Sequence, residues 1–159
     1  MSEIRVDNIT NEAGTGAPEI TDHYKKSNII GTVSESSGVP TGAIIERGSN
    51  ANGEYVKYAD GTMICWVVRF NLSRRAGSIM GDDWNFPANF INTDISTFVD
   101  NTGPVGTGVV IITSSDRRDR STATRVRNTS SAVLAVFSEG NFDSEYIAPV
   151  NAKAIGRWF

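Results

Sequence analysis

Residues 54–71, EYVKYADGTMICWVVRFN, decide how this chain folds. Two runs rich in β-branched and aromatic residues, 54–58 and 62–71, are separated by the three residues 59–61. A connection of this length that contains glycine typically joins adjacent antiparallel strands, because glycine adopts the positive φ that such turns require. The stretch therefore predicts a β-hairpin with Gly61 in its turn.

The second run of this hairpin is apolar on both of its faces. Ile64 and Trp66 share one face and Cys65 and Val67 share the other, since side chains alternate along a strand. Such a run is typical of a central strand covered on both sides. Helix signals are poor throughout the chain, whereas short runs bounded by Gly, Asn or Asp recur. Further strands are predicted at 43–46, 95–99, 107–113, 122–128, 132–138 and 152–158.

Short strands at this spacing favour an all-β fold, an antiparallel β-sandwich, over alternating strands and helices. We expect three parts: an extended N-terminal arm (1–20), a connector rich in Ser, Gly and Thr (21–42), and a sandwich domain (43–159). Within the domain, residues 73–92 lack a strand pattern and are predicted to form a long loop with at most one helical turn.

The composition excludes several classes of protein. Hydrophobic residues make up 39% of the 159 residues, which is ordinary for a globular chain. The formal net charge of −3 gives no overall attraction to nucleic acid or anionic membrane. No apolar run approaches the roughly 18 residues that a membrane span requires, so we expect no membrane insertion. The N-terminus also lacks the basic and then apolar pattern of a secretory signal, so we expect synthesis in the host cytoplasm and delivery by assembly.

Catalytic side chains are scarce. The one histidine, His23, lies in the polar connector and the one cysteine, Cys65, lies in an apolar run, so a nucleophilic Cys–His pair would need the connector folded onto a core strand. A single cysteine excludes an intrachain disulfide and any multi-thiolate metal site. We therefore expect no enzyme activity, no cofactor and no metal. A Ca²⁺ site built from Asp82, Asp83 and Asp94 is the less favoured alternative to surface carboxylates.

Aromatic and polar residues gather in the segment predicted as a loop. Trp84 and Phe86 lie close in sequence to Asp82, Asp83 and Asn89. Aromatic rings in a loop can stack on a sugar while carboxylates and amides bond its hydroxyls, which makes this a candidate ligand-binding loop. The favoured interpretation is instead that the rings form a hydrophobic plug beneath the loop.

The most basic stretch of the chain lies around residue 120. We favour a solvated hairpin partly neutralised by Asp116 and Asp119, and the alternatives are an intersubunit salt-bridge belt and a patch that binds an anionic ligand. Nucleic acid is not an expected partner, because no aromatic residue lies between residues 114 and 130 to stack on bases. The cluster consists of Arg117, Arg118, Arg120, Arg125 and Arg127.

The arm, MSEIRVDNITNEAGTGAPEI, is too short and too polar to bury a core of its own. Ile4, Val6 and Ile9 stand among polar residues, and glycines and a proline follow them. A lone short strand leaves its backbone edges unpaired, so we expect these three residues to anchor the arm on another chain.

Two stretches resemble phage tail-fibre proteins. Residues 4–20 resemble a segment found at the start, or at internal junctions, of tail-fibre and related virion proteins of phages that infect Gram-negative bacteria. Residues 48–66, GSNANGEYVKYADGTMICW, with the closing AIGRWF of 154–159, resemble the C-terminal domain of many phage and prophage tail fibres. The matching residues are Gly48, Ser49, Asn50, Asn52, Gly53, Tyr55, Lys57, Tyr58, Asp60, Gly61, Thr62, Ile64, Cys65, Gly156, Arg157 and Trp158.

The resemblance implies a homotrimeric virion appendage, with an H-type lectin-like sandwich and the arm as its anchor on other tail or capsid proteins. It also implies that the sandwich attaches the particle to a glycan or protein of the host surface. The motifs leave residues 70–150 unmatched, where binding specificity would lie. Because long fibres carry a rod that this chain almost lacks, the alternative is a capsid decoration or head-fibre protein with no receptor role.

Overall fold

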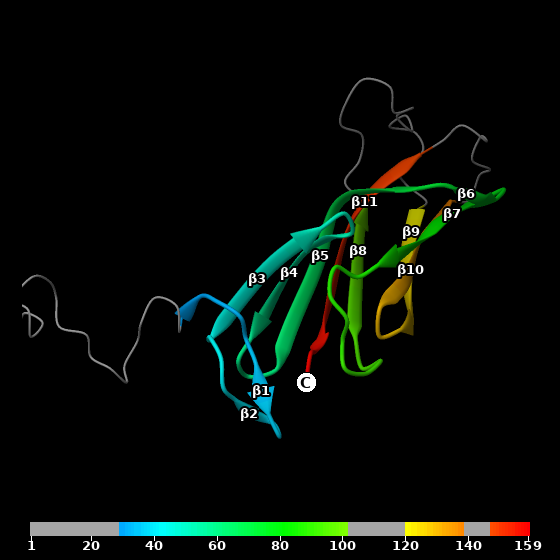
Figure 1. Ribbon diagram of the computed structural model, residues 1–159. Coiled ribbons are helices and arrows are strands. Elements are labelled where there is room, and N and C mark those ends of the chain that lie inside the picture. Colours follow the sequence, from blue (N-terminus) through cyan, green and yellow to red (C-terminus); the bar gives the residue numbers. More distant parts are fainter. Residues whose placement is uncertain (1–28, 102–119, 139–146) are drawn as a thin grey trace, which may run out of the picture.

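Two antiparallel sheets packed face to face form the body of the computed structural model, which describes residues 29–101, 120–138 and 147–159 (Figure 1). The all-β antiparallel sandwich predicted from the sequence is confirmed, since every paired strand in the described residues is antiparallel. The strands are β1 (Glu35–Ser36), β2 (Val39–Pro40), β3 (Ile45–Asn50), β4 (Gly53–Tyr58), β5 (Thr62–Leu72), β6 (Arg74–Ala76), β7 (Ile79–Asn85), β8 (Ser96–Asn101), β9 (Arg120–Asn128), β10 (Ser131–Ser138) and β11 (Ala148–Arg157).

The larger sheet has the strand order β3-β4-β5-β11-β8, and the smaller sheet has the order β6-β7-β10-β9. Strands β1 and β2 form a separate small hairpin within the predicted connector. The predicted strand 62–71 is central, as expected, because β5 is the third of five strands. We call the side of the larger sheet that packs on the smaller sheet the inner face, and the opposite side the outer face.

The predicted hairpin around Gly61 is confirmed. Strands β4 and β5 pair in antiparallel register, and Gly61 has a φ of +89°. The backbone N–H of Thr62 donates to Asp60 Oδ1 over 2.8 Å. This hydrogen bond stabilises the carboxylate and lowers the pKa of Asp60, so the turn is held by a side chain as well as by the glycine.

A second tight turn joins β3 to β4 within the motif GSNANG. Asn50 Oδ1 accepts a hydrogen bond from the Asn52 N–H over 2.8 Å, and Asn50 Nδ2 donates to the Pro87 carbonyl over 2.9 Å. Gly53 has a φ of +133°, and a Cβ there would overlap the carbonyl oxygen of Trp66 on the neighbouring strand. Asn50 therefore stabilises the turn, and Gly53 allows the backbones of β4 and β5 to approach each other closely.

The end of the chain docks on the β4–β5 turn. The Trp158 N–H donates to the Gly61 carbonyl over 3.0 Å, and Trp158 Nε1 donates to the Tyr58 carbonyl over 2.8 Å. The Lys57 ammonium lies 5.5 Å from the centroid of the Trp158 ring, within the range of a cation–π contact. The two halves of the tail-fibre-like motif are thus joined although 100 residues separate Tyr58 from Trp158.

A β-bulge reverses the side-chain alternation of β5. Val67 pairs with Ala152 and Phe70 pairs with Val150, so two residues of β5 stand opposite Asn151. One of the two, Arg69, has a φ of +57°, and its N–H donates to Asn151 Oδ1 over 3.0 Å.

Side chains of both sheets interdigitate in one core. The Trp84 and Phe86 rings meet edge to face with centroids 5.1 Å apart, and Phe86 meets Phe90 in the same way at 5.1 Å. The buried cluster contains Met63, Cys65, Leu72, Met80, Trp84, Phe86, Phe90, Ala132, Leu134, Val136, Ala148, Val150, Ala152 and Ala154.

Strands β8 and β9 bring the edges of the two sheets together on one side of the sandwich. The hydroxyl oxygens of Thr97 and Thr124 are 2.6 Å apart, and the Thr122 hydroxyl donates to the Val99 carbonyl over 3.4 Å. These contacts satisfy backbone and side-chain groups that an open sheet edge would leave to solvent.

The prediction of a long loop at 73–92 is wrong for its first half. Strands β6 and β7 occupy residues 74–76 and 79–85, and β7 pairs with both β6 and β10. The predicted strand 107–113 lies outside the described residues, and the predicted strand 43–46 begins two residues later, as β3. Among the residues described here, no helix is long and apolar enough to cross a membrane.

Candidate binding surface

The outer face of the larger sheet carries a cluster of apolar side chains. Strand register places Val56, Ile64 and Ile155 in one row across three neighbouring strands. The next row contains Trp66, Lys153 and Phe98. We use the term outer-face cluster for the six apolar residues Val56, Ile64, Trp66, Val68, Phe98 and Ile155.

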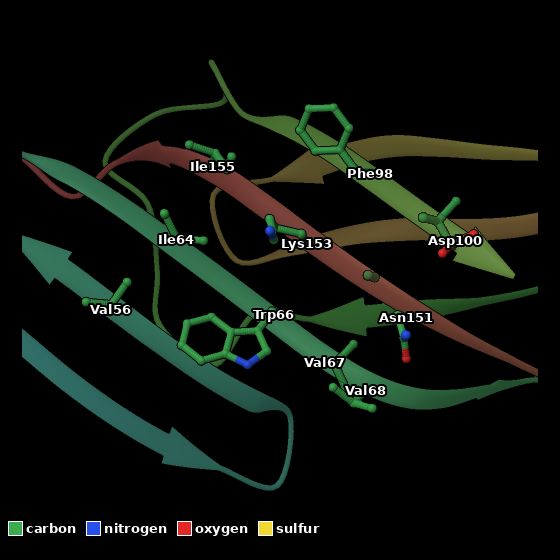
Figure 2. A pocket seen from close by; sticks show the side chains of 12 residues that line it. Val56, Ile64, Trp66, Val67, Val68, Phe98, Asp100, Asn151, Lys153 and Ile155 are labelled. Carbon is green, nitrogen blue, oxygen red and sulfur yellow. The ribbon is translucent and has the colours of Figure 1, made fainter. Parts of the chain in front are cut away.

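The cluster lines an open hollow of about 790 Å³ on the sheet (Figure 2). Figure 2 shows its side chains projecting from the sheet on the side away from the smaller sheet. Val68 is 63% exposed and Phe98 is 57% exposed, whereas Ile64 and Trp66 are half-buried. A second hollow of about 290 Å³ adjoins the first, and Trp66 and Val68 line both. Strand β5 is therefore covered by the smaller sheet on one face only, within the described residues.

Three polar side chains lie among these apolar residues. Asn151 is held by its hydrogen bond from the Arg69 N–H, at the bulge. Lys153 projects between Trp66 and Phe98, and Asp100 lies one row further along β8 (Figure 2). Neither Lys153 nor Asp100 forms an ion pair with another residue of the described ranges. The hollow thus presents an apolar floor with one cation and one anion that have no ionic partner there.

The side chains that line this hollow are chiefly apolar. Its lining includes no cysteine, histidine, serine or tyrosine, and its charged groups are Lys153 and Asp100. Within 29–101, 120–138 and 147–159, no three His, Cys, Asp or Glu residues come together in a way that could hold a metal ion. Large apolar side chains beside two charged groups are typical of a surface that another protein covers.

The residues of the predicted ligand-binding loop lie elsewhere and do not form a loop site. Trp84 is 0% exposed and Phe86 is 4% exposed, so neither ring offers a face on which a sugar could stack. Trp84 Nε1 donates to the Asn52 carbonyl over 2.9 Å, which anchors the ring beneath the β3–β4 turn. Asp82, Asp83 and Trp84 belong to β7, whereas the buried Phe86 and the exposed Asn89 lie in the loop that follows. The geometry is that of a hydrophobic plug.

Asp82, Asp83 and Asp94 do not form the alternative Ca²⁺ site in the structure. Asp82 and Asp83 are consecutive in β7 and point to opposite faces of it. Asp82 Oδ2 accepts a hydrogen bond from the Ser73 N–H, and Asp94 lies in a separate turn closed by Asn92.

One arginine of the basic cluster forms an ion pair with an aspartate of the predicted ligand-binding loop. Arg127 Nε lies 2.8 Å from Asp83 Oδ1, and Arg75 Nη2 lies 3.8 Å from the same oxygen. Arg125 is exposed on β9, and Arg120 is the first residue of that strand. Arg117 and Arg118 lie outside the described residues, as do the arm residues Ile4, Val6 and Ile9 and the histidine His23.

A half-buried carboxylate, that of Glu46, fixes the segment before β3. Glu46 Oε2 accepts from the Val33 N–H and Glu46 Oε1 from the Tyr55 hydroxyl, both over 2.9 Å. Lys57 Nζ lies 3.6 Å from Glu46 Oε1. Burial, and then the hydrogen bond and charge of Glu46, raise the pKa of Tyr55. Each group of this cluster has a partner, so its role is to hold the chain in place.

Cys65 is a buried thiol, in agreement with its apolar sequence context. Burial raises its pKa to about 12, and the thiol donates a weak hydrogen bond to the Ala88 carbonyl. We expect a thiol reagent at pH 8 to modify native Cys65 at least about a hundredfold more slowly than the urea-unfolded chain, because the thiolate is the reactive form. Because the folded pKa exceeds the unfolded one, stability from this group should fall as pH rises from about 9 to about 12. Equal labelling rates in native and unfolded protein would contradict the burial.

Sequence reasoning missed most of the outer-face cluster. The sequence places Ile64 and Trp66 on one face of a strand that is predicted to be covered on both sides. Phe98, Lys153 and Ile155 join them only because β11 lies between β5 and β8. A period-two alternation within β11, in which Lys153 and Ile155 oppose Ala152 and Ala154, is the local signal that could have identified the face.

No protein-family model matches the chain, and no curated protein matches it. Two solved structures are similar to it. One is a P. aeruginosa R1 pyocin fibre comprising C-terminal residues 323–701, with a TM-score of 0.41 and 16% identity over 70% of this chain and 27% of that chain. The other is an N-truncated R1-type pyocin tail fibre, with a TM-score of 0.45 and 19% identity over 72% of this chain and 88% of that chain. The chain thus spans about a quarter of the first structure, and at TM-scores below 0.5 neither structure assigns a function to it.

Proposed function

We propose that this chain is a non-catalytic virion appendage protein of the tail-fibre kind. In this proposal the arm (1–20) anchors a homotrimer on another virion protein, and the sandwich attaches the particle to the host surface. The protein is located on the virion, and its ligand is a glycan or protein of the host.

The observation that carries the proposal is the meeting of the two motif halves. Trp158 and Gly61, which belong to separate stretches of the tail-fibre-like pattern, are joined by a backbone hydrogen bond of 3.0 Å. Gly48, Gly53 and Gly61 all stand where a side chain would meet Tyr55, Trp66 or Arg157. A pattern whose distant parts form one contact network is expected of a conserved structural unit rather than of chance similarity, and this supports the resemblance.

The test is to locate the protein on particles and to measure its effect on adsorption. Particles decorated with gold-labelled antibody against the sandwich should show label at the tail by electron microscopy. Purified protein in excess should reduce adsorption of these particles to host cells. Label on the capsid, with no effect on adsorption, would favour the alternative role as a decoration or head-fibre protein. Label on neither structure would overturn the proposal.

The anchoring role of the arm has its own test. Substituting Ile4→Asp and Val6→Asp together should reduce incorporation into particles at least about tenfold, because charge replaces the apolar contacts expected to bind the partner. The matched control is Asn8→Ala with Thr10→Ala, which changes neighbouring polar residues and should leave incorporation unchanged. Immunoblots of purified particles, with circular dichroism of each free protein, give the measurement. Normal incorporation of the Asp variant would show that the arm is not the anchor.

A further inference from the structure

The outer-face cluster is too apolar to suit exposure to water in the assembled protein. Val68 and Phe98 are each more than half exposed, at 63% and 57%, and they flank the half-buried Trp66. Apolar surface of this kind, gathered on one face, marks a site where another molecule binds.

The character of the lining points to a protein surface rather than to a sugar. Four of the six residues of the cluster, Val56, Ile64, Val68 and Ile155, are aliphatic and offer no ring on which a sugar could stack. Depletion of charged groups in favour of aliphatic and aromatic side chains is typical of the core of interfaces between copies of one chain.

The two charged groups of the face complement each other. Lys153 lies between Trp66 and Phe98, and Asp100 lies on the adjacent strand, yet neither has an ionic partner in the described part of its own chain. A face with one unpaired cation and one unpaired anion is complementary to a copy of itself, since each charge can meet its opposite on the neighbouring copy.

We propose that the outer face of the larger sheet is the contact surface between copies of this chain, with Lys153 of one copy facing Asp100 of another. The apolar cluster contributes the buried area, and the Lys–Asp contact sets the register. The inference rests on the homo-oligomer in the proposed function and names the face that forms it. It does not depend on attachment to the host.

The decisive experiment exchanges the two charges. Lys153→Asp makes both groups of the face acidic and Asp100→Lys makes both basic, so each single variant should weaken self-association at least about tenfold. The double variant, with both substitutions, should assemble as the wild type does. An equimolar mixture of the two single variants should form mixed oligomers more readily than either variant alone, because two of the three contacts in a mixed trimer regain opposite charges. Native mass spectrometry and sedimentation velocity on the full chain distinguish these species.

The apolar part of the contact has a matched pair of variants. Val68→Ser should lower the oligomer fraction, whereas Ile91→Ser should not, because Ile91 is similarly exposed, at 59%, but does not line the hollow. Both positions are solvent-facing, so both proteins should fold, and circular dichroism melts check this for each. Equal oligomer fractions for wild type and Val68→Ser would overturn the inference.

The remaining outcomes identify another occupant. A wild-type oligomer that all four face variants leave intact would place the contact elsewhere, which overturns this inference but keeps the homo-oligomer. A wild-type monomer would overturn both. If deletion of residues 1–28 from that monomer increased oxidative labelling of Val68 and Phe98, the chain's own arm would be the occupant. An oligomer that assembles through this face but does not alter adsorption would contradict the proposed host attachment alone.

Discussion

Gly53→Val is expected to destabilise the sandwich by about 3 kcal/mol or more. At a φ of +133° the Gly53 backbone has a conformation that is essentially reserved for glycine. A side chain there would also overlap the carbonyl oxygen of Trp66. That oxygen belongs to the central strand of the sheet and has little freedom to move. Urea unfolding followed by circular dichroism measures the loss.

Substitutions at two other glycines distinguish backbone strain from steric overlap as the cause of the stability loss. Gly38 has a φ of +81° with nothing within 4 Å of an added Cβ, so Gly38→Ala should cost only the backbone term of about 1–2 kcal/mol. Gly61→Val should impair folding to an intermediate degree, because its Cβ meets the guanidinium of Arg157, which is a flexible side chain that can move away. If all three variants lose the same stability, steric overlap with Trp66 is not the reason for glycine at position 53.

Trp84→Ala should lower the free energy of unfolding by about 3–5 kcal/mol, because it leaves a cavity in the core and an unpaired carbonyl. The ring is completely buried, packs edge to face on Phe86, and donates its N–H to the Asn52 carbonyl. The same measurement, urea unfolding of the purified protein, applies.

A graded variant distinguishes packing from hydrogen bonding. Trp84→Phe keeps an aromatic ring but loses the donor, so its cost should be well below that of Trp84→Ala. The interpretation of Trp84 as a core residue would be contradicted by an alanine variant with wild-type stability that has lost binding to a glycan.

The features that could be predicted from the sequence are those with a local physical cause. The turn at Gly61 follows from three residues between two strand-like runs, and the opposed faces of β5 follow from alternation. The turn holds in the structure, and the alternation holds as far as the bulge at Arg69, because neighbouring residues determine both. The burial of Cys65 likewise follows from its apolar neighbours.

Strand β7 could not be recognised in this way, because its composition opposes it. The run 79–85, IMGDDWN, contains a glycine and two aspartates, which are depleted in strands. Gly81 is needed there because a Cβ would lie 2.9 Å from the Leu134 carbonyl of β10. The pairing with β10 therefore overrides local preference, and Trp84, assigned to a loop, instead belongs to a strand. The only local indication of a strand is that Met80 and Trp84, an even number of residues apart, both point into the core.

The outer-face cluster depends on strand order, which a single sequence does not reveal. Phe98 and Trp66 lie far apart along the chain, and they share a row only because β11 inserts between their strands.

The insertion of β11 has a consequence for how the molecule folds. Strand β11 lies between β5 and β8, although about 80 residues of chain separate its partners on β5 from its own start. Bringing such distant segments together costs loop-closure entropy before any contact rewards it, so this pairing should limit the folding rate. Until it forms, β5 and β8 each present an unpaired edge to other molecules, which makes the incomplete sheet the species most prone to aggregate. Trp158 then bonds to the Gly61 and Tyr58 carbonyls, and these two hydrogen bonds hold the end of β11 against the β4–β5 turn.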